Sequence, residues 1–81
     1  MYFVYMLLSE DSNKHSYVGS TNNIVKRIKL HNEGKGAKYT KGRNWKVIYK
    51  KKYKNKSEAL KEEYKLKKNY KLRKEIKKKY L

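Results

Sequence analysis

The sequence lacks several residue types, and each absence narrows what the protein can be. It contains no cysteine and no proline, and it has 7 acidic residues among 81. Without cysteine there is no disulfide and no thiolate zinc site, and two histidines alone do not suit a structural zinc site. The absence of cysteine fits a reducing cytoplasm, which is the location we expect. Association with the nucleoid is compatible with this location.

Long hydrophobic runs are also missing. The main apolar run covers residues 2–8, whereas a membrane-spanning helix needs about 20 apolar residues. It has no basic segment before it and is followed by Ser9-Glu10-Asp11, which does not match a signal peptide. We therefore expect no membrane partner and interpret this run as a strand buried on both faces. The length predicts a single domain over residues 1–81.

The sequence is rich in positively charged residues. The chain has 24 lysines and arginines and a net charge of +17. Phosphate backbones are common partners of such surfaces, because each neutralised phosphate releases a counterion. A lysine excess can also follow from an AT-rich genome. The charge is concentrated in residues 46–81, which carry +12, so this half is the expected electrostatic platform.

The pattern of apolar residues, caps and turns predicts the element order β-β-α-β-α-α. A second strand is expected at residues 15–19, paired antiparallel with the first across the turn at Asp11-Ser12-Asn13. A helix is expected from about 22 to 33, ending at Gly34. A third strand follows at residues 45–53. The fold class is therefore α+β (mixed α/β), with a small three-stranded antiparallel sheet flanked by helices.

A Lys-rich helical segment is predicted over about residues 58–80, with Ser57 as its N-cap. We expect a break into two helices at Asn69, and the alternative is one bent helix. Leu60 and Tyr64 lie four residues apart and are expected to mark the buried side of its first part. In its second part, apolar residues repeat every four positions at Leu72, Ile76 and Tyr80.

Two sets of side chains on the first three elements could carry chemistry. Tyr5 and Tyr17 lie on the first two strands, and Gly19 indicates a bend or the close approach of another group. Arg27 and His31 lie one helical turn apart and project side by side. An arginine can hold a phosphate, and a histidine can exchange a proton. Each residue also has an ordinary interpretation, as a core tyrosine or as part of an exposed basic face.

Glu63 is a candidate metal ligand. Acidic residues are scarce, and Mg²⁺ binds through one or two carboxylates while it keeps several waters. Glu63 lies close to the expected buried stripe, so it should face the sheet, whereas Glu62 is turned farther away. The alternative is an i, i+4 ion pair between Glu63 and Lys67.

Together these residues resemble the GIY-YIG nuclease superfamily, and most closely its small stand-alone bacterial members. Phe3 and Val4 stand where the first motif has glycine and isoleucine, and Val18 replaces isoleucine in the second. The likeness covers nearly the whole chain. It is carried by Phe3-Val4-Tyr5, Tyr17-Val18-Gly19-Ser20-Thr21, Arg27 with His31, Gly34-Lys35-Gly36-Ala37, and Glu63.

The resemblance implies a role for each residue. Tyr5 and Tyr17 would line the site, with one of them orienting or activating the attacking water. Arg27 would contact the scissile phosphate, and His31 would assist proton transfer or positioning. Glu63 would hold a single Mg²⁺ or Mn²⁺, and Gly19 would have a structural role. The expected nucleic-acid contacts are Lys26, Lys35, Lys38, Lys41, Arg43, Lys67 and Lys68.

The expected function is therefore a metal-dependent endonuclease that hydrolyses phosphodiester bonds in DNA rather than RNA. Lysines on phosphates fix position and carry no sequence information, so cleavage should be structure-dependent or weakly specific, as in DNA repair or processing. We assume a monomer. One alternative is a non-catalytic DNA- or RNA-binding module that keeps the fold. Another is a basic RNA- or ribosome-associated structural protein.

Overall fold

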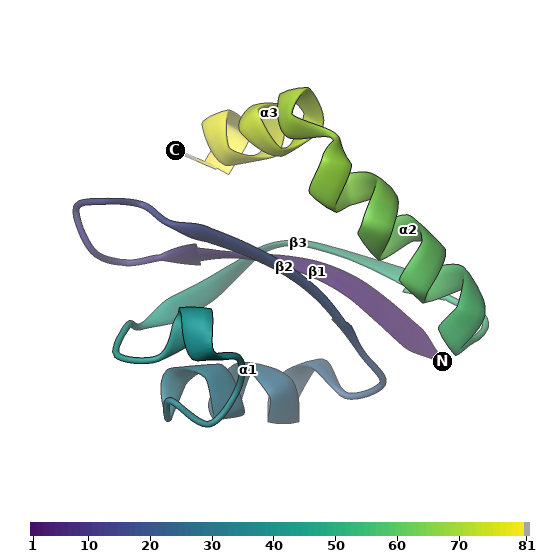
Figure 1. The fold of residues 1–81 in the computed structure, drawn as a ribbon, viewed down its shortest axis with the longest axis horizontal. Coiled ribbons are helices and arrows are strands. Elements are labelled where there is room, and N and C mark those ends of the chain that lie inside the picture. The colour runs from purple at the N-terminus through teal and green to yellow at the C-terminus, as the bar shows by residue number, and fades with distance from the viewer. Residues whose placement is uncertain (81) are drawn as a thin grey trace.

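The computed structural model describes residues 1–80 and has the predicted element order (Figure 1). A short 3-10 helix, η1, was not predicted and interrupts the loop that follows the first helix. None of the helices in residues 1–80 is long and apolar enough to span a bilayer. The elements are β1 (Tyr2–Ser9), β2 (Ser16–Thr21), α1 (Ile24–Asn32), η1 (Lys38–Thr40), β3 (Trp45–Tyr53), α2 (Lys56–Lys68) and α3 (Tyr70–Tyr80).

The three strands form one antiparallel sheet in the order β2-β1-β3. Helix α1 covers one face of this sheet, while α2 and α3 cover the other (Figure 1). Because β1 lies in the centre, both of its faces are buried, and residues 4–9 are at most 1% exposed. This position explains why its sequence is continuously apolar, as predicted. The two edge strands each leave one side of their backbone free of a neighbouring strand.

Side chains alternate between the two faces of β1 and divide the core into two clusters. Val4 and Met6 pack with Ala59 and Leu66 of α2. Tyr5 and Leu7 point to the other face, where they pack with Trp45 and with the partly buried Ile24 and Ile28 of α1. Tyr5 is therefore a core residue on the α1 face of the sheet.

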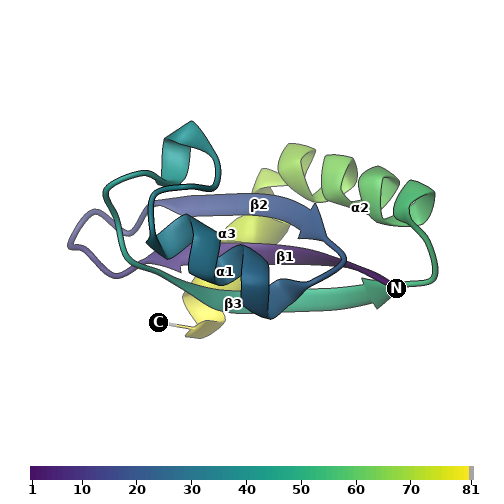
Figure 2. The ribbon, with the colours of Figure 1, turned by 90° about the horizontal axis from the view of Figure 1, so that it is seen from below.

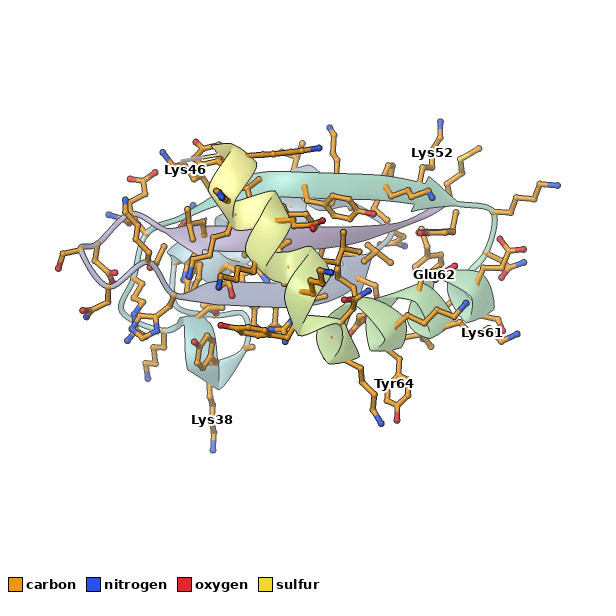
Figure 3. All side chains as sticks on the ribbon, turned by 90° about the horizontal axis from the view of Figure 1, so that it is seen from above. Lys38, Lys46, Lys52, Lys61, Glu62 and Tyr64 are labelled. Carbon is orange, nitrogen blue, oxygen red and sulfur yellow. The ribbon has the colours of Figure 1, made fainter. Side chains whose placement is uncertain are left out.

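Helix α2 corrects two sequence-based predictions. Its N-cap is Asn55, whose side chain accepts a hydrogen bond from the backbone N–H of Glu58, so Ser57 lies inside the first turn. The predicted buried residues Leu60 and Tyr64 are 48% and 58% exposed, and Tyr64 extends away from the domain (Figure 3). The side facing the sheet is instead set by Ala59 and Leu66, which are buried. One residue step turns a helix by about 100°, so Leu60 points away.

Helix α3 lies on the sheet without any buried residue of its own among those described. Asn69 separates it from α2, as predicted, and its side chain accepts a hydrogen bond from the backbone N–H of Leu72. Of the predicted apolar repeat, Ile76 packs against the first core cluster, whereas Leu72 and Tyr80 are 39% and 44% exposed.

These positions predict different stability effects for two leucines of α2. Leu66→Ala should lower the free energy of unfolding by about 2–4 kcal/mol, because it removes a buried side chain and leaves a cavity. Leu60→Ala, the matched control on the exposed side, should change it by less than about 0.5 kcal/mol. Urea unfolding followed by circular dichroism measures both. Equal losses would contradict the placement of α2.

Candidate functional site

The centre of the site is a hydrogen bond between two fully buried side chains. Tyr5 on β1 and His31 in the last turn of α1 are both 0% exposed, and 2.9 Å separates the phenol oxygen from Nε2. The rings meet edge to face, with their centroids 5.9 Å apart. The sequence places His31 on the same face of α1 as Ile24 and Ile28, so it is turned toward the sheet.

The directions of the hydrogen bonds follow from the partners of His31. Its Nδ1 lies 2.9 Å from the hydroxyl oxygen of Thr40, and that hydroxyl donates to the carbonyl of Ala37 at 2.8 Å. A threonine hydroxyl has one proton, so it accepts from Nδ1–H. Burial, together with the charge of Arg27, lowers the pKa of His31 and favours the neutral ring. Nε2 is then an acceptor, and Tyr5 donates to it.

Arg27 connects this buried pair to the surface. Its Nε donates to the phenol oxygen of Tyr5 at 3.4 Å, and the guanidinium also lies beside Tyr17. Burial raises the pKa of the Tyr5 phenol, against the opposing effect of Arg27, so the phenol stays protonated near neutral pH. The hydrogen bond to Tyr5 is the main cause of the raised pKa of Arg27. Arg27 therefore supplies a fixed positive charge, partly exposed, next to two phenols.

Two glycines make room for these rings. Gly19 pairs directly with Tyr5 across the sheet, and a Cβ built on it would lie 2.6 Å from the Tyr5 hydroxyl oxygen and 2.8 Å from Cζ. Gly36, after α1, leaves similar room for His31: a Cβ there would lie 2.5 Å from Nδ1. The sequence-based expectation that another group approaches Gly19 closely is therefore confirmed.

A row of aromatic rings leads from this pair to the surface. Tyr17 on β2 has its ring centroid 5.0 Å from that of His31 and 6.4 Å from that of Tyr5. Tyr39 of η1 stacks on Tyr17 at 6.3 Å and 23° and is 50% exposed. Tyr39 and Thr40 were not predicted as site residues, because neither lies in a helical or strand pattern. Gly36 was noticed only as part of the glycine-rich motif.

Glu63 reaches the site from the opposite face of the sheet. The hydroxyl of Ser20 on β2 donates to its Oε1 at 2.5 Å, and Nζ of Lys67 lies 2.7 Å from Oε2. The side chain of Glu63 is 15% exposed, compared with 37% for Glu62. Glu63 thus faces the sheet as predicted, and it also forms the ion pair with Lys67 that was the alternative interpretation.

The five predicted residues therefore surround one edge strand. Four of them, Tyr5, Tyr17, Arg27 and His31, form a contiguous network on the α1 face, while Glu63 contacts β2 from the α2 face. Both faces are reached from the free side of β2, where η1 and α2 extend past the strand (Figure 2). The negative charge of Glu63 is also among the minor causes that raise the pKa of Tyr5. The five residues thus lie on two faces of the sheet that meet at its β2 edge.

The predicted nucleic-acid contacts differ in their surroundings. Lys26, Lys35, Lys38 and Lys41 are exposed, and Lys38 extends past β2 on the same side as Tyr64 (Figure 3). The other three have partners within the protein. Arg43 pairs with Asp11 at 3.3 Å, Lys67 pairs with Glu63, and Nζ of Lys68 lies 4.8 Å from the ring centroid of Tyr64.

Comparison with known proteins shows the family to which the chain is related. A family model described as the GIY-YIG catalytic domain matches residues 1–79. The chain belongs to the GIY-YIG family. The family is associated with endonucleases, so the chain contains a nuclease-type domain, and a nucleic-acid partner is implied.

The chain is also similar to UPF0213 proteins of several organisms. The chain is 48% identical over 66 residues to a UPF0213 protein of Oceanobacillus iheyensis, covering 80% of this chain and 74% of that one. It is 49% identical over 65 residues to a UPF0213 protein of Clostridium perfringens, covering 79% and 68%. Identity to the UPF0213 protein YazA of Bacillus subtilis is 42% over 64 residues, covering 78% and 63%. No solved structure matches.

The donor set of this GIY-YIG domain can be tested against the divalent metal that the family generally uses. Within residues 1–80, no three or more His, Asp or Glu side chains are grouped so as to hold an ion. Glu63, with the Ser20 hydroxyl beside it, is a single hard-oxygen site. This fits Mg²⁺ or Mn²⁺, since Mg²⁺ accepts one carboxylate and keeps most of its waters, and it does not fit an all-protein cage.

Gly19→Ala should destabilise the domain by about 1–3 kcal/mol, because the added methyl group overlaps the buried Tyr5 ring. The cost should be smaller in a Tyr5→Leu background, which removes the ring. A double-mutant cycle from chemical unfolding measures this coupling. Additive effects of the two substitutions would show that the methyl group and the ring do not meet.

The state of His31 predicts how stability depends on pH. Its pKa is lowered in the folded protein, while the unfolded chain takes up a proton near the ordinary value of about 6.5. The free energy of unfolding should therefore fall as the pH is lowered from about 7 to 5.5. His31→Gln should flatten this dependence, and His15→Gln should leave the His31-dependent part in place. An unchanged pH dependence in His31→Gln would contradict the buried neutral imidazole.

Proposed function

We propose that this chain is a divalent-metal-dependent endonuclease that hydrolyses phosphodiester bonds in DNA. The observation that carries the proposal is the fixed Arg27 guanidinium between two tyrosine phenols, with the Glu63 carboxylate held on the same stretch of the edge strand. A phosphodiester at this edge would have a cation on one side and a carboxylate-bound metal on the other. Such a pair of charges suits the pentavalent transition state.

The two tyrosines have different roles in this proposal. Tyr5 is 0% exposed and is hydrogen-bonded to both His31 and Arg27, so it acts as a positioning residue. Tyr17 is partly exposed and lies nearer the surface. We assign it the contact with the attacking water, whose proton its phenol oxygen can accept as a hydrogen bond.

Arg27 contacts the scissile phosphate and balances the negative charge that develops there. Its Nε is occupied by Tyr5, which fixes the plane of the guanidinium and leaves its terminal nitrogens for phosphate oxygens. His31 acts through Tyr5. As the acceptor of the phenol proton, it directs the phenol oxygen lone pairs toward Arg27.

Glu63 would hold the metal ion, which when bound polarises the phosphodiester and stabilises the leaving oxygen. In the free protein, Lys67 neutralises this carboxylate and Ser20 fixes it. Lys67 is 50% exposed, so it can turn toward a phosphate when the carboxylate takes a cation.

Substrate choice should depend on nucleic-acid structure more than on sequence. The exposed lysines near the site contact phosphates, which are the same at every position. Tyr39 offers an exposed ring next to Tyr17, on which an unpaired or displaced base can stack. A weakly specific or structure-dependent enzyme of DNA repair or processing fits these features.

A second candidate is a non-catalytic nucleic-acid-binding module. The specific observation in its favour is that Lys67 already pairs with Glu63 at 2.7 Å. A carboxylate neutralised in this way could be structural, holding α2 on β2. The two candidates share the fold and the charge, and they differ in metal-dependent turnover.

Four substitutions test the site, and two of them compare adjacent carboxylates. Glu63→Gln should reduce cleavage at least about 100-fold, because it removes the metal ligand, and Glu62→Gln should stay within about twofold of the wild type. Tyr17→Phe and Arg27→Lys should each lower kcat. The assay uses labelled single-stranded, duplex, nicked and branched DNA, with matched RNA, in Mg²⁺ or Mn²⁺.

Cleavage that persists in Glu63→Gln or Arg27→Lys at the wild-type rate would reject the site. Binding to the panel without cleavage under any metal condition would support the non-catalytic module. Preferential cleavage of RNA would reject DNA as the substrate.

A further inference from the structure

A small cavity lies between α3 and the first residues of β2. It is on the opposite face of the sheet from Tyr5 and Tyr17. Its volume is about 230 Å³, which is below the size of a typical drug-sized site and suits a small group. Three of its six lining residues are cationic. The lining residues are Met6, Ser16, Tyr70, Arg73, Lys74 and Lys77.

Arg73 lines this cavity, and one of its donor atoms has no hydrogen-bond partner among the described residues. Its Nε has less than 1 Å² of exposed surface and no hydrogen-bond partner among the described residues. The guanidinium carbon lies 5.7 Å from the ring centroid of Tyr70, which flanks the arginine. Buried polar atoms are nearly always hydrogen-bonded, so an exception calls for a partner. An N–H donor needs an acceptor, and the neighbouring positive charges favour an acceptor that is anionic.

The chemistry of the lining indicates phosphate. Arg73, Lys74 and Lys77 supply three positive charges, and the hydroxyls of Ser16 and Tyr70 supply further donors. No acidic side chain is among the lining residues. A guanidinium presents its donors in a plane that matches two oxygens of a phosphate.

The cavity is aligned with the proposed catalytic edge. Ser16 in the cavity and Ser20 beside Glu63 are four residues apart on the same strand. Even-numbered steps keep both serines on the same face, and four residues of a strand span about 13 Å. A nucleic-acid strand that follows β2 would therefore bring another phosphate to the cavity.

We propose that the cavity around Arg73 binds a backbone phosphate of nucleic acid, a few nucleotides from the scissile bond. The inference rests on the nucleic-acid partner of the proposed function and adds a second contact, on α3. It gives α3 a binding role that is separate from catalysis. The same chemistry would accept free inorganic phosphate, so the test has an arm for each source.

The first measurement is nuclear magnetic resonance of the Arg73 Nε–Hε signal in ¹⁵N-labelled full-length protein, in metal-free buffer that prevents cleavage. A short oligodeoxynucleotide should shift this signal saturably, at concentrations where inorganic phosphate and chloride of equal ionic strength do not. A saturable shift with inorganic phosphate alone would overturn the nucleic-acid assignment. No shift with either probe would overturn the site.

The second measurement compares oligonucleotide affinities of variants that remove one charge from α3. Arg73→Gln should weaken binding about tenfold or more, in line with a lost charged hydrogen bond. Lys78→Gln, on an exposed position of the same helix, should weaken it about two- to threefold through charge alone. Arg73→Lys should recover only part of the affinity, since it keeps the charge but loses the planar donors. Equal effects of Arg73→Gln and Lys78→Gln would overturn the proposal.

Failure of this inference can be separated from failure of the proposed function. Metal-dependent cleavage without the Arg73 shift would support the nuclease and reject the phosphate cavity. An Arg73 shift in a protein that cleaves nothing would support the cavity and reject catalysis. Circular dichroism of each variant shows whether α3 remains folded, so that a loss of affinity is attributed to the contact.

Discussion

The hydrogen bond between Tyr5 and His31 imposes most of the other constraints on this small domain. Both side chains are fully buried, so each of their polar atoms needs a partner inside the protein. Thr40 satisfies the second ring nitrogen, and Arg27 donates to the phenol oxygen. The same rings need space, which Gly19 and Gly36 provide by having no side chain. One buried polar contact thus determines the residue types at four other positions.

Much of the fold could be predicted from the sequence, because its local signals agree with its tertiary environment. The apolar run of β1, the turn after it, the Asn69 break and the glycine after α1 each appear where the pattern placed them. The error in α2 has a physical reason. Leu60 and Tyr64 are the large apolar residues ahead of Leu66, yet the small Ala59 occupies the contact with the sheet. Apolar size alone therefore misidentified the buried side.

For the candidate site, the sequence suggested residues and left their arrangement open. The spacing of Arg27 and His31 on one helix placed them side by side, and the scarcity of acidic residues singled out Glu63. The family resemblance then assigned roles to Tyr5 and Tyr17. The sequence carries no signal that Thr40 would face His31 or that Tyr39 would stack on Tyr17, since both depend on the path of an irregular loop. Nor does it reveal that Glu63 reaches β2 from the other face, because this depends on how α2 crosses the sheet.

Helix α3 packs weakly on the sheet, and this affects how the protein responds to salt. This helix has no buried residue among those described, and three consecutive lysines stand in its last turn. In a chain with a net charge of +17, mutual repulsion opposes docking of the helix onto the sheet. Dissolved anions screen that repulsion, and a bound polyanion would neutralise it locally. Moderate salt should therefore tighten the fold while it weakens attraction to a phosphate backbone, so that nucleic acid and simple electrolyte act as competing counterions for the same helix.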